Sequence, residues 1–440
     1  MIIERDIFYG LSDWKSSSDR KPLILQGARQ TGKTWLMKTF GERCFKHIAY
    51  FNFDKNDELH HVFEGTKDVE RLLGKLAFYT KCPIIPQETL IVFDEIQECN
   101  KALNCLKYFC EEAPEYAIVA AGSLLGVSLS KGDSFPVGKV DFLRIYPLTF
   151  KEFLAADSPE LFEFAEKIDS IEEIPLIIFN RLAEAFQRYQ LTGGMPEAVS
   201  NFLDNKGIEK VEEDLQIILQ AYELDFAKHA EKADIPRITA IWKSVPSQLS
   251  RENRKFLYKL VKPGARAREY EDALLWLEQA GLIHRIFATA KPFLPLKVYD
   301  DLTAFKIYLS DIGLLRRLAN LPPEIILSGS PLYTEFKGAM AENAVLQSLM
   351  TQFEVTPRYW YSEGRAEVDF VIQHITNIIP IEVKSAENVA GKSLHVFNEQ
   401  YLPKLRIRYS FKNLKKDGNL LNIPLFLADW TKKIINFCME

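Results

Sequence analysis

The sequence predicts an α/β protein that begins with a doubly wound parallel sheet. Within the first 150 residues, short apolar runs alternate with helical patterns. Each run is nearly continuous and rich in β-branched or aromatic residues, as expected for a parallel strand covered on both faces. A repeated order of strand, helix and strand builds a doubly wound sheet. The alternation ends with the segment PLTFKEFL, so this sheet is confined to the first part of the chain.

The predicted elements follow in order along the chain. Five strands are expected in the first part, at 22–26, 47–54, 90–95, 116–123 and 142–148, with helices such as 33–40 and 68–79 between them. We expect four domains, namely the α/β core at 1–150, a helical part at 151–230, a third domain at 231–325 and a compact α/β domain at 330–440.

The three later domains are recognised by their patterns. Residues 151–230 are helical throughout, and the break Gly193-Gly194-Met195-Pro196 separates two helices, because proline suits the first turn of a helix. Residues 231–325 have three helical patterns and then two strand-like runs, which is the order of a winged helix. Residues 330–440 begin with a long helical pattern that leads into three strand-like runs.

The composition is that of an ordinary globular protein, with 47% apolar and 26% charged residues. No apolar run approaches the roughly 18–20 residues that span a bilayer, and the first residues do not resemble a secretory signal. Six cysteines in 440 residues do not make a disulfide framework, so we expect reduced thiols, a cytoplasmic protein and no membrane contact. The net charge of −5 excludes a polycation, so any contact with DNA must use a local patch.

A glycine-rich loop follows the first expected strand. The stretch QGARQTGKTWLM fits the pattern G-x-x-x-x-G-K-T and lies between a strand and a helix, which is the context that this motif requires. Loop amides and the helix N-terminus offer partial positive charge to phosphate oxygens, the lysine adds a full charge, and the threonine hydroxyl can ligate Mg²⁺. The expected ATP-binding residues are Gly27, Ala28, Arg29, Gln30, Thr31, Gly32, Lys33 and Thr34.

Two acidic residues end the third expected strand, in LIVFDEIQE. Asp94 lies at the carboxyl edge of the sheet, where open α/β sheets bind ligands, and is expected to bind ATP and hold its Mg²⁺ together with Thr34. Glu95 is the candidate base that orients or deprotonates the attacking water. Ser123 ends the next strand and is a candidate sensor of the outer phosphate, with an ordinary turn serine as the alternative. Lys33, Glu95 and Ser123 are the expected catalytic residues of an ATP hydrolase.

Together these residues resemble a known family. The segments GARQTGKTWLM, LIVFDEIQ, AGSLLG, LTGGMPEAV, YLSDIGLL and KGAMAENAVLQSL are similar to those of prokaryotic P-loop ATPases that carry an AAA domain of the archaeal-ATPase-like type and a C-terminal DUF4143 region. The resemblance implies an AAA+-like core, a helical lid at 151–230 and a winged helix, with the DUF4143 region spanning about 195–400. EVDFVIQ and IPIEVKS resemble the PD-(D/E)xK nuclease superfamily, which implies a nuclease-like domain at 330–440.

One departure from the family concerns a residue that acts across subunits. The family often has Gly-Arg before the final core strand, where this chain has Gly138-Lys139. Lysine cannot make the planar two-point contact that arginine makes with phosphate. Whether Lys139 or Arg144 replaces an arginine finger, and whether the chain forms a ring or another homo-oligomer, stays open.

The nuclease resemblance falls on four charged residues. Glu382 and Lys384 are two residues apart and so share one face of a strand, Asp369 lies on the preceding strand, and Glu342 lies on the helix before it. The resemblance implies that Glu342, Asp369 and Glu382 hold a second divalent metal, with Lys384 as a catalytic residue that stabilises charge on the phosphate. The alternative is a degenerate nuclease fold kept as a binding or dimerisation module.

Two basic stretches are candidate DNA contacts. The segment KLRIRYSFKNLKK at 404–416 interleaves aromatic and basic residues, although a solvated strand and turn is the preferred interpretation. Arg266 and Arg268 begin a helix whose next residues include three acids, which would be repelled from a DNA groove. Residues 231–325 are therefore expected to pack against the chain or to dock a protein partner.

Two functions remain. The first is an Mg²⁺-dependent ATPase coupled to a nuclease-like domain that acts in DNA processing or defence. The second is a nucleotide-switched protein-interaction module whose nuclease fold is inactive. Metal binding that is lost in Asp369→Ala while nucleotide binding survives favours the first, and an ATP-dependent change of oligomeric state without a metal effect favours the second.

Overall fold

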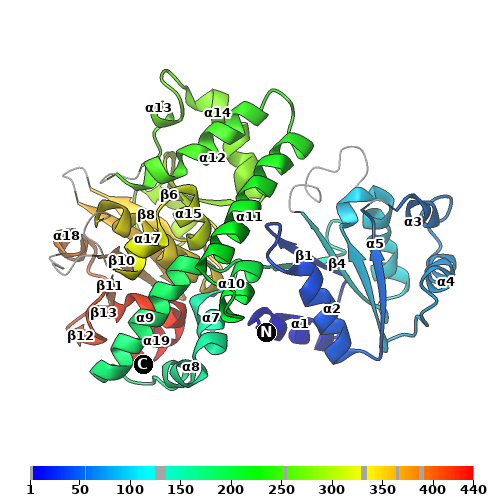
Figure 1. Cartoon of the computed structure of the whole chain (residues 1–440), viewed down its shortest axis with the longest axis horizontal. Coiled ribbons are helices and arrows are strands. Elements are labelled where there is room, and N and C mark those ends of the chain that lie inside the picture. Colours follow the sequence, from blue (N-terminus) through cyan, green and yellow to red (C-terminus); the bar gives the residue numbers. More distant parts are fainter. Residues whose placement is uncertain are drawn as a thin grey trace. The chain divides into compact units, whose positions relative to one another are not determined.

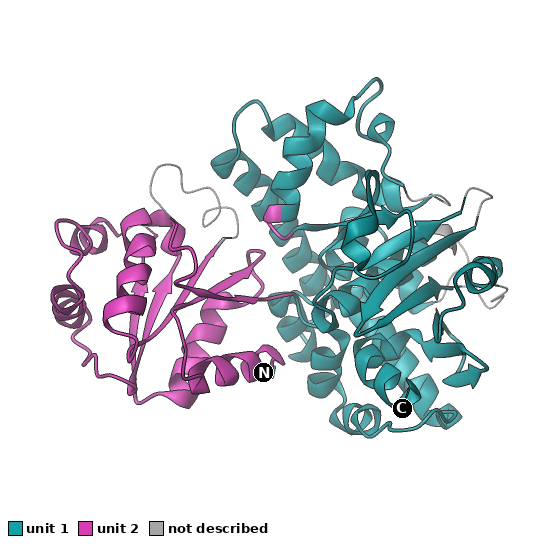
Figure 2. Cartoon of the chain, turned by 180° about the vertical axis from the view of Figure 1, so that it is seen from behind, with its two compact units in different colours: residues 1–4, 147–278, 282–440 teal, residues 5–146, 279–281 magenta. Residues whose placement is uncertain are grey.

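The computed structural model describes residues 3–54, 56–123, 135–251, 255–328, 334–362, 366–385 and 391–439. The chain forms two compact units, which are coloured separately in Figure 2. The N-terminal unit is Arg5–Tyr146 with Gln279–Gly281, and the C-terminal unit is Met1–Glu4, Pro147–Glu278 and Leu282–Glu440. Within the described ranges no helix combines the length and the apolar character needed to cross a membrane.

The N-terminal unit contains the predicted parallel sheet. Its strand order is β2-β3-β4-β1-β5, and every pair is parallel. The five strands are β1 (Leu23–Gly27), β2 (His47–Asn52), β3 (Thr89–Asp94), β4 (Ala117–Ser123) and β5 (Asp141–Arg144). All five predicted strands are therefore confirmed. Only β5 is clearly shorter than expected, ending before Pro147, which has no N–H to donate to a strand partner.

Helices cover both faces of this sheet (Figure 1). They are α1 (Ile7–Ser16), α2 (Lys33–Cys44), α3 (Asp57–Val62), α4 (Val69–Thr80) and α5 (Asn100–Glu112), with a short 3₁₀ turn η1 (Ile96–Glu98) after β3.

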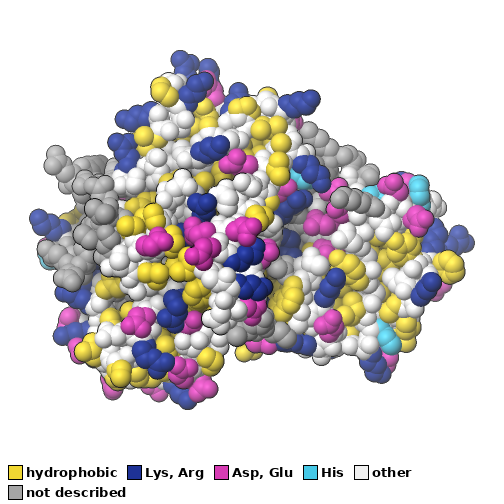
Figure 3. All heavy atoms as spheres, viewed as in Figure 1, with side chains coloured by type: hydrophobic (Ala, Val, Ile, Leu, Met, Phe, Trp, Pro, Cys, Tyr) yellow, Lys and Arg dark blue, Asp and Glu magenta, His cyan; other side chains and the backbone are white. Residues whose placement is uncertain are grey.

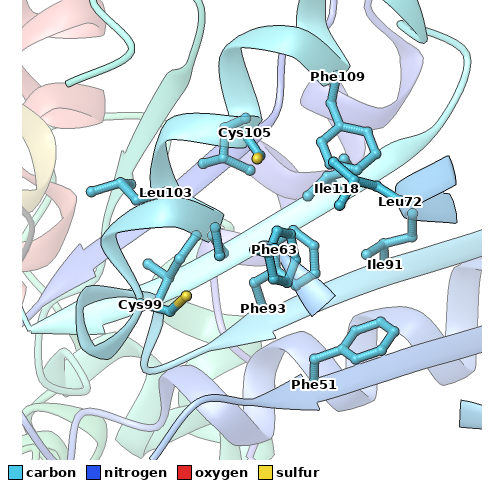
Figure 4. Close-up of a cluster of buried hydrophobic side chains, with 14 of the residues drawn as sticks. Phe51, Phe63, Leu72, Ile91, Phe93, Cys99, Leu103, Cys105, Phe109 and Ile118 are labelled. Carbon is cyan, nitrogen blue, oxygen red and sulfur yellow. The ribbon is translucent and has the colours of Figure 1, made fainter. Parts of the chain in front are cut away.

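Strand β3 shows why helices must pack on both faces of the sheet. Its side chains alternate between two cores, and all six residues are buried. Leu90 and Val92 belong to the core under α1 and α2. Ile91 and Phe93 belong to the core under α4 and α5, where Phe93 contacts the ring of Phe109 (Figure 4). The strand is therefore a fixed support for the acidic residues at its end.

The C-terminal unit begins with the predicted helices. These are α7 (Phe150–Asp157), α8 (Pro159–Glu166), α9 (Leu176–Thr192), α10 (Pro196–Leu203) and α11 (Ile208–His229). The following part contains α12 (Ile235–Leu249), α13 (Tyr258–Val261) and α14 (Ala267–Gln279), and then the hairpin of β6 (Ile283–Thr289) and β7 (Asp300–Leu309), with η2 (Leu296–Tyr299) between its strands. The remaining helices are α15 (Ile312–Leu318), α16 (Pro323–Leu327), α17 (Thr334–Gln352), α18 (Lys392–Tyr401), η4 (Leu425–Trp430) and α19 (Thr431–Met439).

A single eight-stranded sheet runs through this unit, in the order β12-β13-β11-β10-β9-β8-β6-β7. Its later strands are β8 (Arg358–Tyr361), β9 (Glu367–His374), β10 (Asn377–Val383), β11 (Arg406–Ser410), β12 (Lys415–Asp417) and β13 (Leu420–Pro424). Strands β8, β9 and β10 form the predicted meander. The hairpin expected for a separate third domain joins them, because β6 pairs with β8 through Ala288 and Tyr359. The boundary expected between residues 325 and 330 is therefore no break in the sheet.

The Gly193-Gly194 pair is a tight backbone junction inside the C-terminal unit. A Cβ atom on Gly193, where φ is +66°, would lie 2.3 Å from Asp311 Oδ1, and one on Gly194 would lie 2.0 Å from Leu148 O. The Gly194 amide donates to Asp311 Oδ2 at 2.6 Å, and Asp311 also caps α15 by accepting from the amide of Leu314. Burial raises the pKa of Asp311 to about 6. Only glycine fits this junction, which accounts for the predicted helix break.

Candidate functional site

The glycine-rich loop connects the end of β1 to the start of α2. Gly27 ends β1, and a Cβ atom there would lie 2.4 Å from Ile145 O, so glycine is required. Gln30 and Gly32 have φ of 62° and 89°, in the left-handed region. Such turns let successive backbone amides face one concave site, and the N-terminus of α2 adds its dipole. The loop therefore has the backbone form of a phosphate-binding loop.

Lys33 lies at the start of α2 and folds back over this loop. Its Nζ donates to Gly27 O at 2.8 Å and to Ala28 O at 2.7 Å. Burial lowers the pKa of Lys33 to about 8, an effect that the nearby carboxylates of Glu95 and Asp94 partly oppose. The ammonium group of Lys33 thus donates to two backbone carbonyls, and it can exchange these acceptors for phosphate oxygens.

Asp94 is buried at the carboxyl end of β3 and joins two hydroxyl groups. Its Oδ2 accepts from Thr34 Oγ1 at 2.8 Å and from Tyr50 OH at 2.7 Å, and its Oδ1 accepts from the backbone amide of Glu95. The predicted pair of Thr34 and Asp94 is therefore brought together as expected. Tyr50 was not predicted, although it lies on β2, the neighbour of β3, and its register partner is Val92. Burial and the bond to Asp94 raise the pKa of Tyr50, so the hydroxyl stays a donor.

Glu95 follows directly and turns the chain away from β3. Its φ of 52° is left-handed, which is uncommon for a residue with a side chain. Gln97 Nε2 donates to Glu95 Oε2 at 2.5 Å. Left-handed backbone at a non-glycine residue costs free energy and is concentrated at functional sites. Gln97, like Tyr50, was missed because a lone glutamine in a 3₁₀ turn gives no sequence signal.

Arg5 is a further residue that the sequence did not reveal. Its guanidinium is buried and donates to Thr31 O at 3.1 Å and to Tyr146 O at 2.7 Å. It therefore joins the loop to the segment that follows β5, on the side where Ile145 packs under Gly27. Arg5 is a positioning residue for the loop.

The remaining predicted residues of this unit lie at its edges. Ser123 ends β4 and is the register partner of Gly27, which places its backbone at the same edge of the sheet. Lys139 forms an ion pair with Glu111 at 2.9 Å, and Arg144 packs on the ring of Tyr146. A role for Lys139 or Arg144 across a subunit interface stays a prediction.

The C-terminal candidates are Asp369 on β9, Glu382 on β10, Lys384 directly after β10, and Glu342 on helix α17. Glu382 Oε1 pairs with Lys384 Nζ at 2.8 Å, and Asp369 Oδ2 accepts from the amide of Val383 at 2.8 Å. Burial raises the pKa of Glu382, and Asp369 adds to this while Lys384 opposes it. Glu382 Oε2 is buried and has no hydrogen-bond partner in the described part of the chain.

Glu342 does not complete this group as expected. It is buried on α17, and its Oε2 accepts from the hydroxyl of Tyr308 on β7. Among the residues that the structure describes, no three or more His, Cys, Asp or Glu side chains form a group that could hold a metal ion. The three predicted ligands Glu342, Asp369 and Glu382 therefore do not form one group in the described part of the chain, and metal binding by them stays a prediction.

Comparison with protein families identifies three parts of the chain. Residues 19–154 match the AAA domain, residues 183–325 match a domain of unknown function, DUF8612, and residues 337–426 match a second domain of unknown function, DUF4143. The chain thus carries an AAA domain and a C-terminal DUF4143 region, as the resemblance implied. The DUF4143 region is shorter than the expected 195–400, since most of that range belongs to DUF8612. No curated protein matches the chain.

Several solved structures resemble the chain at low identity. A Walker-type ATPase of Pyrococcus abyssi is 13% identical with a TM-score of 0.46, and the match covers 72% of this chain and 96% of that protein. The ORC1 protein of Aeropyrum pernix in complex with DNA is 14% identical with a TM-score of 0.27 over 74% of this chain and 95% of its own. DnaA of Aquifex aeolicus bound to AMPPCP is 15% identical with a TM-score of 0.26 over 62% and 86%.

Proposed function

We propose that this chain, in which an AAA domain precedes a DUF4143 region, is an Mg²⁺-dependent ATP hydrolase. The observation that supports it most is the bond between Thr34 Oγ1 and Asp94 Oδ2 at 2.8 Å. It places a hydroxyl and a carboxylate oxygen side by side, next to a loop built for phosphate. These are the hard oxygen donors that Mg²⁺ takes in nucleotide sites.

Each residue has a distinct role in this proposal. The loop amides and Lys33 bind the phosphates, with Lys33 leaving the carbonyls of Gly27 and Ala28 as they arrive. Thr34 and Asp94 would hold Mg²⁺, which supplies positive charge at the outer phosphates. Glu95 orients the attacking water and accepts its proton once Gln97 releases the carboxylate.

A matched pair of variants tests this proposal. Glu95→Gln is expected to bind ATP normally and to hydrolyse it at least about a hundredfold more slowly, because an amide cannot accept the proton. Glu98→Gln changes an exposed glutamate of the same 3₁₀ turn and should hydrolyse ATP like the parent. Lys33→Ala should lose ATP binding. Hydrolysis by Glu95→Gln at the parent rate would contradict the role of Glu95, and unimpaired ATP binding by Lys33→Ala would contradict the site.

We also propose that the ATPase is coupled to a nuclease-like domain in DNA processing or defence. The motivating observation is Glu382 Oε2, a buried carboxylate oxygen that has no partner among the described residues. Glu382 lies near Asp369, and Lys384 neutralises only its other oxygen. The two carboxylates fit a divalent cation, which would relieve the cost of burying them. Lys384 would stabilise charge on a phosphate.

Metal binding separates this function from the nucleotide-switched module. The full chain carrying Asp94→Asn, which removes the first metal site, is heated with and without Mn²⁺ and without nucleotide. A nuclease-like site predicts a rise in Tm that Asp369→Asn abolishes and that Asp417→Asn, an exposed control on β12, preserves. No rise in the parent would favour an inactive fold that acts through a protein partner or a homo-oligomer. The helical lid at 151–230 and the winged-helix character of 231–325 are part of the same proposal, although the pairing of β6 with β8 joins 231–325 to 330–440 in one sheet.

A further inference from the structure

The connection between α12 and α14 is strongly basic. Residues 251–268, RENRKFLYKLVKPGARAR, contain seven Lys or Arg and one Glu. The whole chain carries a net charge of −5, so this stretch opposes the overall sign. The charges of such a segment repel one another, and an anionic partner would relieve this repulsion.

Four cations of this stretch are exposed, and we call them the basic corner: Lys259, Lys262, Arg266 and Arg268. None of the four makes an ion pair with another described residue, whereas Arg285 nearby pairs with Glu271 and Glu278. Figure 3 shows Lys and Arg side chains gathered over α13 and its surroundings. The charges of the basic corner are therefore available to a ligand.

The basic corner rests on an anchored base. Phe256 stacks on Phe305 of β7 with ring centroids 5.2 Å apart, and its amide donates to Phe305 O at 2.7 Å. The ring of Tyr258 packs edge-on against Phe256 at 4.9 Å, and Gln248 bonds both backbone groups of Leu257. The backbone between the charges is thus held while their long side chains remain free to adjust.

The acidic residues of α14 argue against insertion of this helix into a DNA groove. They do not argue against a contact between DNA and the start of the helix. Glu271 and Glu278 are already paired with Arg285, and Glu269 Oε2 accepts from the amide of Arg266. The negative charge that would meet a partner at the basic corner is therefore less than the sequence suggests. This negative charge still lies along α14, the helix that would have to enter a DNA groove.

We propose that the basic corner binds the phosphate backbone of a nucleic-acid duplex without reading its bases. Its charge complements a regular array of phosphates. No large apolar side chain is exposed between residues 255 and 268, so it lacks the apolar face of a bilayer-binding surface and the ring platform of a single-strand site. The inference rests on the proposed function for its role in DNA processing, but the contact itself requires no ATP hydrolysis.

The number of cations sets the expected salt dependence. If all four neutralise a phosphate, the logarithm of the binding constant falls with the logarithm of salt concentration with a slope of about −3.6. Between roughly 50 and 200 mM salt the affinity should drop by about two orders of magnitude. Removing two of the four charges should halve the slope, which a purely structural effect of the substitutions would not do.

The test measures fluorescence anisotropy of a labelled DNA duplex of about 20 base pairs with the full chain over a salt series. The double variant Lys262→Ala/Arg266→Ala should lower the slope to about −1.8, and Lys262→Glu/Arg266→Glu should weaken binding at least tenfold. The control Lys404→Glu/Lys415→Glu makes the same charge change at exposed lysines of the other basic stretch and should bind like the parent.

Three results would overturn the proposal. They are duplex binding that survives the charge reversal, equal loss in the control, and stronger binding to a single strand or to phosphatidylserine vesicles than to the duplex. Lys33→Ala should keep duplex binding while losing ATP, so failure of the ATP site and failure of the basic corner give different results. The circular dichroism of each variant must match that of the parent.

Discussion

The pKa of Lys33 predicts how ATP affinity depends on pH. Burial lowers this pKa from 10.5 to about 8 in the nucleotide-free protein. Phosphates beside Nζ favour the charged form and should restore a high pKa in the complex. Binding above about pH 8 must therefore take up a proton, and the affinity must fall as the pH rises.

The size of the effect follows from the fraction of charged lysine. At about pH 9 only around one in ten free molecules would carry the proton, so ATP should bind about tenfold more weakly than at about pH 7. The stability of the free protein should change in the opposite direction. Its folded-state pKa is depressed, so the unfolded chain binds more protons between about pH 8 and 10.5, and stability rises with pH across that window.

Isothermal titration calorimetry measures the ATP affinity and the number of protons taken up on binding. Titrations of ATP with Mg²⁺ in two buffers of different ionisation enthalpy give the number of protons taken up, which should approach one at about pH 9 and be small at about pH 7. Lys33→Arg keeps its charge at all these pH values and should show no uptake if it binds. A flat affinity between these pH values, or no proton uptake in the parent at about pH 9, would refute the reasoning.

Three further predictions concern other residues. Gly193→Ala should lower the free energy of unfolding by more than about 3 kcal/mol in urea titrations, because left-handed strain adds to the clash with Asp311, whereas Gly418→Ala, with φ of +60° and nothing within 4 Å, should cost about 1 kcal/mol. Similar losses for the two variants would show that the close contact is unimportant. Arg5→Ala removes two charged hydrogen bonds that hold the loop and should weaken ATP binding at least tenfold in the same calorimetric assay; unchanged affinity would remove its positioning role. Lys139→Ala should slow hydrolysis without loosening ATP if Lys139 acts across a subunit interface, and equal steady-state rates would exclude it.

The sequence was sufficient for the residues whose place follows from sheet topology. Parallel strands bring their carboxyl ends to one edge, so a loop after β1 and a carboxylate after β3 must meet, and Thr34 does bond Asp94. Tyr50 and Arg5 reach the same site from β2 and from the segment before α1. Neither belongs to a spaced motif, and their contacts depend on tertiary packing.

In the C-terminal unit, the sequence alone predicted the strands but not how distant elements contact one another. The meander of β8, β9 and β10 was predictable from local alternation, and so was the place of Glu382 on β10, with Lys384 directly after the end of that strand. The orientation of helix α17 about its own axis was not predictable. This orientation brings Glu342 next to Tyr308, whose hydroxyl donates to it. The pairing of β6 with β8 joins residues about 70 positions apart, and no local pattern reveals such a contact.

That pairing affects how this chain can be divided or recombined. The DUF8612 match ends at residue 325 and the DUF4143 match begins at 337, yet β6 of the first hydrogen-bonds β8 of the second. Cutting the gene between them would leave the edges of both strands unpaired, and such edges promote aggregation. A gene fusion or exchange that separates the two regions should yield insoluble halves. We therefore expect the two regions to pass between genes as one piece.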